Sequence, residues 1–256
     1  MFDVVVSNAG LAYGKHRIFT GLNFVLKGGH WTCLLGGSGV GKTSLLRFIA
    51  GLHIGEGVET EGGAYCQDGS LLKGRIAWMA QQDLLLPWYS VLDNITLGAK
   101  LRTSFFRKNK LSLAAKDKAY MILKRVGLED KANTLPQNLS GGQRQRVALA
   151  RTLMENRPVV LMDEPFSALD AITRLNLQDL ACELLANKTV LLITHDPLEA
   201  LRLGHQVYHL QGHPARLTDA IEPLGDTPRS LDDKYLMSLQ GKLLDRLRSE
   251  VHTFRD

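Results

Sequence analysis

The sequence predicts an α/β fold with a mainly parallel sheet, an antiparallel β subdomain and an inserted all-helical subdomain. Two short runs, 159–162 and 189–193, are apolar throughout, which is typical of parallel strands buried on both faces. Strands that alternate with helices indicate the α/β class. Residues 92–156 interrupt that alternation, because helix-favouring Leu, Ala, Lys and Arg dominate much of that stretch.

The N-terminal part of the chain is β-rich. Apolar or β-branched runs separated by turns predict short strands at 3–7, 24–26 and 31–35. A helix is expected from about Lys42 to Ala50, closed by Gly51. Glycines and polar residues over 56–70 are typical of turns between further short strands.

The later elements follow from similar signals. Gly127 is a plausible stop for the first helical stretch, and another helix is expected over 141–156, before Pro158. We expect a single domain over 1–256. Its parts are a catalytic core with a β subdomain (about 1–90 and 157–225), a helical subdomain (about 91–156) and a C-terminal helical tail (about 226–256).

The composition excludes several protein classes. With 256 residues, 45% hydrophobic and 22% charged, the chain is neither fibrous nor wholly disordered. It has no apolar run of the roughly 18–20 residues that a membrane-spanning helix needs, and its first residues lack the pattern of a secretory signal. Cys33, Cys66 and Cys182 lie far apart, so we expect small buried or neutral residues in a reducing compartment, not a zinc site or disulfides.

The basic excess is concentrated in one segment. The net charge is +5, but residues 100–125 carry nine Lys or Arg and one acid, a net +8, which leaves −3 on the other 230 residues. The segment contains Phe105–Phe106. Two interpretations stay open, a solvated helix face and contact with an anionic membrane leaflet. Nucleic acid is not expected as a partner.

A glycine-rich loop follows the predicted strand 31–35. It has the pattern G-x-x-x-x-G-K-T and precedes a predicted helix, the context in which such a loop binds phosphate. Its amides and the helix N-terminus would face an anion, Lys42 would contact the β- and γ-phosphates, and the Thr43 hydroxyl would hold Mg²⁺. This predicts a P-loop NTPase core that binds a nucleoside triphosphate. The candidate residues are Gly36, Gly37, Ser38, Gly39, Val40, Gly41, Lys42, Thr43 and Ser44.

Polar residues follow both buried strands. Asp163 and Glu164 end the first run, and because ligands of α/β sheets bind at the carboxyl ends of strands, Asp163 would hold Mg²⁺ and Glu164 would accept a proton from water. The alternative is a pair of solvated turn residues. His195 follows the second run, before Asp196, Pro197 and Glu199, which read as N-cap, N1 and N3 of a helix. We expect His195 to bond the γ-phosphate or its water.

The segment Leu139-Ser140-Gly141-Gly142-Gln143 resembles the signature of the ATP-binding cassette (ABC) ATPases. Ser140 is expected to cap a helix, and the glycines would let backbone amides face an anion. The segment lies about 20 residues before Asp163, as in that family. The resemblance implies that it completes the site of a partner subunit, so that two chains sandwich two ATP molecules head to tail.

Further segments resemble the family's motifs. Gln81 is similar to its Q-loop glutamine, and the spacing to Pro87 favours it over Gln82. Ser167, Ala168, Leu169 and Asp170 resemble the D-loop, and Tyr13 sits where the family keeps an aromatic that stacks on adenine, a core role being the alternative. The resemblance thus implies ATP and Mg²⁺ as cofactors. The catalytic residues would be Glu164, His195 and Lys42; Tyr13 and Gln81 would join the loop in binding ATP; and the metal ligands would be Thr43, Gln81 and Asp163.

The branch of the family follows from the chain's organisation. A nucleotide-binding domain without a membrane span resembles a bacterial importer subunit, peripheral on the cytoplasmic face of the inner membrane. The resemblance implies a homodimer on two permease subunits, with a periplasmic solute-binding protein. The segment 84–88 is similar to subunits for the uptake of nitrate, sulfonate, taurine and thiamine pyrimidine precursors. The tail most resembles the thiamine-pyrimidine-precursor group. The alternative is a soluble ABC ATPase, as in iron–sulfur assembly.

Overall fold

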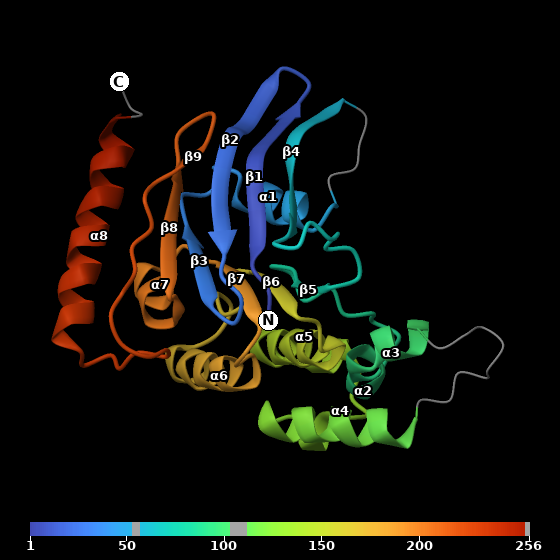
Figure 1. Ribbon diagram of the computed structural model, residues 1–256. Helices are drawn as coiled ribbons and strands as arrows, with labels where there is room; N and C mark the ends of the chain where they lie inside the picture. The colour runs from blue at the N-terminus through green and yellow to red at the C-terminus, as the bar shows by residue number, and fades with distance from the viewer. Residues whose placement is uncertain (53–56, 103–111, 254–256) are drawn as a thin grey trace. The chain divides into compact units, whose positions relative to one another are not determined.

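The computed structural model describes residues 1–52, 57–102 and 112–253 (Figure 1). The chain divides into two compact units. The first comprises Met1–Gly74 with Thr189–Asp256, and the second comprises Arg75–Lys188. The basic residues Arg107, Lys108 and Lys110 and the pair Phe105–Phe106 lie outside the described residues.

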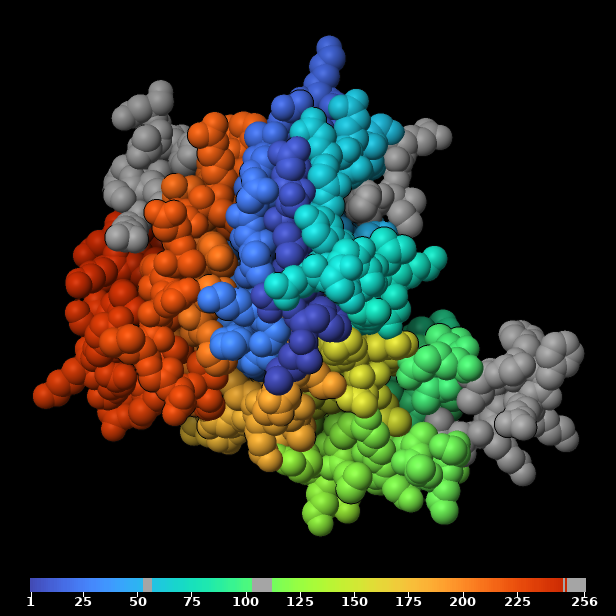
Figure 2. Space-filling model, viewed as in Figure 1, coloured from blue at the N-terminus to red at the C-terminus, as the bar shows by residue number. Residues whose placement is uncertain are grey.

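The first unit contains an antiparallel sheet of order β2-β1-β4. Its strands are β1 (Val4–Tyr13), β2 (His16–Leu26) and β4 (Val58–Cys66). Val4 pairs with Leu26 on one side and with Cys66 on the other. In Figure 2 the atoms of these strands stand side by side, with β1 between β2 and β4.

These strands are longer than the sequence predicts. A register shift between Val6 and Ala9 interrupts the β1–β2 ladder, and Asn8 has a positive φ of 48°. Such a bulge interrupts the alternation of inward and outward side chains. The sequence pattern therefore predicts a strand of only five residues, 3–7, for β1. Gly62, opposite the bulge, has a φ of 66°, and a Cβ there would lie 2.2 Å from the Ser7 carbonyl oxygen.

The parallel sheet of the first unit has the order β7-β3-β8-β9. β3 pairs in parallel with both β7 and β8, and β9 pairs antiparallel with β8. Every residue of β3 and β7 is buried, as expected for strands covered on both faces. The strands are β3 (Trp31–Leu35), β7 (Thr189–Ile193), β8 (Gln206–Gln211) and β9 (Arg216–Leu217).

Among its described residues, the first unit also has three helices. α1 (Lys42–Ile49) follows β3, and α7 (Pro197–Leu203) follows β7 and contacts β3. α8 (Lys234–Thr253) lies against α7, as Figure 1 shows. Because β3 leads into α1 and β7 into α7, the candidate residues 36–43 and His195 lie at strand ends.

The second unit combines two parallel strands with helices. β5 (Ile76–Met79) pairs with β6 (Val159–Asp163), which is buried throughout. The helix α5 (Gly141–Glu155) contacts β5, α2, α3 and α4. The remaining elements are α2 (Val91–Ile95), α3 (Leu97–Arg102), α4 (Leu113–Arg125), the 3₁₀ turns η1 (Glu129–Lys131) and η2 (Pro136–Asn138), and α6 (Ala171–Leu184).

The expected helix ends and the expected burial of the cysteines are confirmed. The helix predicted from Lys42 ends one residue earlier, and Gly127, with a φ of 67°, follows the end of α4. Cys33, Cys66 and Cys182 are all buried. Within the described ranges, none of the helices is both long and apolar enough to cross a bilayer.

Candidate functional site

The first unit contributes the phosphate loop, residues 36–43, at the carboxyl end of β3. The Lys42 ammonium donates to the carbonyl oxygens of Gly36 and Gly37, at 2.8 Å each, which holds the loop curled. Gly39 and Gly41 have φ values of 80° and 110°, which other residues adopt only with strain. α1 begins directly behind the loop, and its N-cap Gly41 offers no capping side chain. This leaves a helix N-terminus suited to phosphate.

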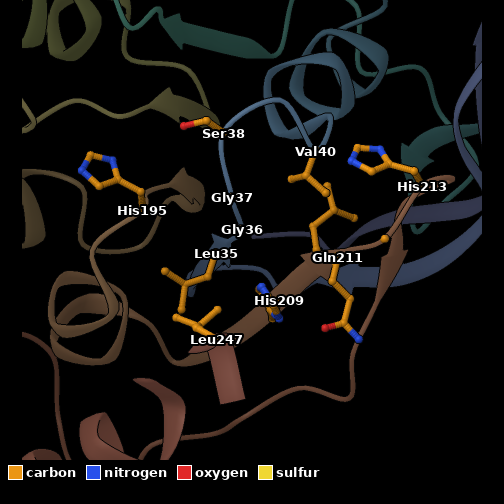
Figure 3. Close-up of a pocket in the computed structure, with 12 residues that line it drawn as sticks. Leu35, Gly36, Gly37, Ser38, Val40, His195, His209, Gln211, His213 and Leu247 are labelled. Atoms are coloured by element: carbon orange, nitrogen blue, oxygen red, sulfur yellow. The ribbon is translucent and has the colours of Figure 1, made fainter. Parts of the chain in front are cut away.

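A pocket of about 320 Å³ lies beside the phosphate loop. Figure 3 shows Leu35, Gly36 and Gly37 running toward Ser38, with His195 and His213 on opposite sides. The end of β8 and Leu247 of α8 complete the lining. The structure thus brings His195 and the phosphate loop to one pocket, whereas Tyr13 is not among its lining residues.

His195 is held by the turn between β7 and α7. The side chain of Asp196 accepts from the backbone N–H groups of Leu198 and Glu199, at 2.9 and 3.4 Å, and Pro197 occupies the first turn. The predicted N-cap is therefore confirmed. The Asp196 N–H in turn donates to the Thr194 hydroxyl at 3.0 Å. His195 is thus fixed between two residues with local hydrogen bonds.

The second unit contributes the acidic pair at the end of β6. Asp163 is only 3% exposed, so the interpretation as a solvated turn residue is wrong for it. Glu164 has a positive φ of 47°, an unusual conformation for a residue other than glycine. Its carbonyl oxygen accepts from the Ser167 hydroxyl at 3.0 Å.

Gln81 lies on the segment 80–90, here called the Gln81 loop, between β5 and α2. Its Nε2 donates to Oε2 of Glu164 at 3.3 Å. This contact favours Gln81 over Gln82 as the glutamine that acts together with Asp163 and Glu164. The loop is also held at its far end, where the buried Asn94 accepts from the Leu86 N–H and donates to the Leu86 carbonyl.

The signature segment, Leu139–Gln143, starts α5 with a capping box. The Ser140 hydroxyl accepts from the Gln143 N–H at 3.2 Å, and Gln143 Oε1 accepts from the Ser140 N–H at 2.9 Å. The predicted capping role of Ser140 is confirmed. A Cβ on Gly142 would lie 3.3 Å from a methyl group of Leu169, so the segment 167–170 packs beside the signature segment.

Two further predicted residues are clearly placed. Asp170 is the N-cap of α6, and the N–H that Thr173 donates to it, at 3.0 Å, lowers the pKa of its carboxyl group. Tyr13 ends β1 and is 39% exposed, so its interpretation as a core residue is wrong. Its predicted role in stacking on adenine stays a prediction.

Sequence reasoning missed the residues that anchor the Gln81 loop to α5. No motif in the sequence singles out Arg144 or Arg151, yet both guanidinium groups bond Asp83. Their partners are 61 and 68 residues away in sequence, and neither helical periodicity nor a motif could have indicated such contacts. Gln145, which bonds the Pro165 carbonyl, was missed for the same reason.

The expected Mg²⁺ site is consistent with the donor chemistry of the chain. Within the described residues no cluster of three His, Cys, Asp or Glu could hold a metal. Mg²⁺ in nucleotide sites needs no such cage, because one or two carboxylates with phosphate oxygens suffice. The hydroxyl of Thr43, the amide oxygen of Gln81 and the carboxylate of Asp163 are hard oxygen donors of the required kind.

Comparisons with known proteins point to one family. A family model described as "ABC transporter" matches residues 19–167. A Haemophilus influenzae protein described as an uncharacterized ABC transporter ATP-binding protein is 46% identical over 253 residues, covering 96% of this chain and 99% of the relative. An aliphatic sulfonates import ATP-binding protein, SsuB of Yersinia pestis, is 36% identical over 249 residues, covering 96% and 86%.

Solved structures are similar as well. The dimeric, post-hydrolysis ATP-binding cassette MJ0796 bound to ADP and Pi superposes with a TM-score of 0.74 at 30% identity. The match covers 87% of this chain and 100% of that one. A second dimeric structure of that cassette gives a TM-score of 0.73 at 28% identity, with the same coverage.

Proposed function

The chain belongs to the ABC transporter family, and from that membership we propose that it is the ATP-hydrolysing subunit of an importer, which drives solute uptake through separate permease subunits. Its activity as a cassette ATPase is the conversion of ATP and water to ADP and phosphate. The similarity to importer ATP-binding subunits over nearly the whole chain supports the direction of transport.

The main structural support for ATP hydrolysis is the contact between Gln81 and Glu164. Glu164 acts as the general base that accepts a proton from the attacking water. Gln81, which donates to one of its carboxylate oxygens, holds that oxygen in place. His195, on the lining of the pocket beside the phosphate loop, orients the γ-phosphate.

The phosphate loop binds the nucleotide. The Lys42 ammonium, which bonds two loop carbonyls, contacts the β- and γ-phosphates when ATP is bound. Tyr13, exposed at the end of β1, stacks on adenine. Thr43, Gln81 and Asp163 would hold Mg²⁺ and its waters, and the ion would supply charge that neutralises the developing phosphate charge.

The working form is a homodimer. The signature segment of each chain binds the ATP of its partner through the N-terminus of α5, and residues 167–170, packed beside it, lie at the dimer seam. The dimeric state of the similar cassette structures supports this proposal.

The dimer works on two membrane permease subunits at the cytoplasmic face of the inner membrane, with a periplasmic solute-binding protein supplying the cargo. The cargo is a nitrate- or sulfonate-like solute or a thiamine pyrimidine precursor. The SsuB relatives, named as aliphatic sulfonate import subunits, support the first class.

Contact with an anionic leaflet rests on the basic segment 100–125. Ion pairs already occupy three of its described side chains, because Lys100 pairs with Asp93, Arg102 with Glu155 and Arg125 with Glu183. The membrane contact then falls to the six other basic residues of the segment, which are Arg107, Lys108, Lys110, Lys116, Lys118 and Lys124. We test the contact at Arg107, Lys108 and Lys110. Neutralising these three should reduce binding to anionic liposomes and its salt sensitivity, and unchanged binding would refute the contact.

Isolation of the native complex tests the transport assignment. Detergent extraction of membranes that express the tagged chain should yield it together with integral membrane subunits. Reconstituted in liposomes with the periplasmic protein and its solute, this complex should couple ATP hydrolysis to uptake. A stable complex without any integral membrane protein would instead indicate a soluble ABC ATPase. Binding of nitrate, sulfonates and thiamine precursors to the periplasmic protein would identify the cargo.

A further inference from the structure

One guanidinium group joins the signature segment to the Gln81 loop. Arg144 directly follows the signature segment on α5. Its Nε donates to Oδ2 of Asp83 at 3.0 Å, and its Nη1 donates to the carbonyl oxygen of Leu139 at 2.8 Å. Because a guanidinium is planar and its donors are fixed relative to one another, a shift of Leu139 is passed to Asp83. Asp83 lies two residues after Gln81.

A second arginine holds the same loop two helical turns further on. Arg151 donates through Nη2 to the Asp83 carbonyl at 2.7 Å and through Nη1 to the Leu84 carbonyl at 2.9 Å. Leu84 has a positive φ of 46°, a strained conformation that persists where surrounding contacts fix it. Burial lowers the pKa of Arg151, and the charge of Asp83 opposes that shift.

A third side chain of α5 contacts the turn that follows Glu164. Gln145 is 5% exposed, and its Nε2 donates to the Pro165 carbonyl at 2.8 Å. Pro165 directly follows Glu164, so this bond fixes the turn that presents the candidate base. Gln81 and Glu164 are themselves in contact at 3.3 Å. One helix therefore holds both sides of that contact.

The spacing of these residues on α5 explains how one helix contacts both the Gln81 loop and the Glu164 turn. Arg144 and Arg151 are seven positions apart and share one face of the helix, whereas Gln145 projects about 100° away. The capping box ties the signature segment to the first turn of the same helix. Any displacement of Ser140–Gln143 therefore moves Arg144, Gln145 and Arg151 together.

We propose that Arg144, Gln145 and Arg151 are positioning residues that couple the signature segment to the Gln81–Glu164 pair of the same chain. Phosphate bound at the signature segment shifts α5, and α5 sets the Gln81 loop and the Glu164 turn for hydrolysis. Since the signature segment serves the partner's ATP, the occupancy of one nucleotide site controls hydrolysis at the other. The inference rests on the proposed dimeric ATPase function.

The test uses the full-length protein and substitutions that keep charge. Arg144→Lys and Arg151→Lys each retain a cation, but the lysine ammonium on its flexible stem lacks the rigid planar fork by which the guanidinium fixes two acceptors relative to one another. We expect kcat for ATP hydrolysis to fall about tenfold, the Hill coefficient to drop toward 1, and ATP affinity to stay within about twofold. Arg146→Lys is the matched control, because Arg146 on the same helix donates to the Val126 carbonyl instead. It should leave all three quantities unchanged.

A double-mutant cycle separates coupling from a purely structural role. If Arg144 relays the state of Ser140, the losses in kcat from Ser140→Ala and Arg144→Lys will not add, whereas those from Ser140→Ala and Arg146→Lys will. Additive losses in both cycles, or an Arg144→Lys variant with wild-type kcat and Hill coefficient, would overturn the inference. A wild-type protein that does not hydrolyse ATP would instead refute the proposed function.

Discussion

Gln81 and Glu164 meet through a hydrogen bond of 3.3 Å between Nε2 and Oε2, although 83 residues separate them in sequence. The glutamine follows β5 and the glutamate follows β6, and these strands pair in parallel. Parallel pairing brings the two carboxyl ends to the same edge of the sheet. The candidate base is therefore held by a neighbouring strand's loop rather than by its own turn alone.

Replacing the candidate base should separate ATP binding from hydrolysis. In Glu164→Gln the side chain keeps its size and its contact with Gln81 but cannot accept a proton. We expect kcat to fall by at least about 10²-fold, while ATP still binds and still drives dimerisation, as measured by phosphate release and light scattering. Glu129→Gln, on η1, is the control and should hydrolyse ATP normally. Wild-type turnover in Glu164→Gln would refute the base assignment.

The phosphate loop should not tolerate a methyl group at its first glycine. A Cβ on Gly36 would lie 2.6 Å from the Leu210 carbonyl oxygen of β8, so Gly36→Ala must displace backbone. We expect a loss of about 1–3 kcal/mol in the free energy of unfolding and weaker ATP binding, measured by urea denaturation and nucleotide titration.

Gly37→Ala is the matched control for stability. A Cβ there meets nothing within 4 Å, so its free energy of unfolding should equal that of the wild type. If both variants have the same free energy of unfolding, the Leu210 carbonyl of β8 can move away from the added methyl group without destabilising the fold.

A buried arginine should be essential for the stability of the first unit. Arg229 is 4% exposed and donates to five backbone carbonyls, including those of Leu201 and Gly204 at the end of α7. Arg229→Met keeps much of the volume but leaves these acceptors without their donor. We expect a loss of about 3 kcal/mol in the free energy of unfolding, measured by urea denaturation. The exposed Arg216→Met should cost nothing measurable, and a similar cost for both variants would contradict this role.

Stability should decline in mild acid because of His205. Burial lowers its pKa below the ordinary value of 6.5, and the neighbouring His30 and Arg229 lower it further. The folded state therefore binds the proton more weakly than the unfolded state. The free energy of unfolding should be constant above the unfolded-state pKa of 6.5 and should fall as the pH drops below 6.5. Urea denaturation at a series of pH values measures it.

His205→Asn provides the comparison. Nδ1 of His205 accepts from the Trp31 N–H at 3.0 Å, and the asparagine oxygen can accept in its place without titrating. The variant should lose less stability than the wild type between neutral and mildly acidic pH. An identical acid dependence would exclude His205 as the cause.

Local signals in the sequence predicted the elements that carry the chemistry. The run 189–193 coincides with β7, and the helix expected from residue 141 is α5, because apolar runs and capping residues report on their own surroundings. The prediction failed at β1 and β2, where the bulge near Asn8 breaks the alternation. It also could not find the Asp83–Arg144 and Gly36–Leu210 contacts, since these depend on residues distant in sequence.

The burial of all three thiols has a practical use. Cys33 and Cys66 are 0% exposed and Cys182 is 8% exposed, and thiol reagents react with accessible thiolates. A cysteine introduced at Ile172, which is 74% exposed at the start of α6, would then be labelled selectively without removing the native ones. Spin labels at this position on two chains would report their separation before and after ATP is added.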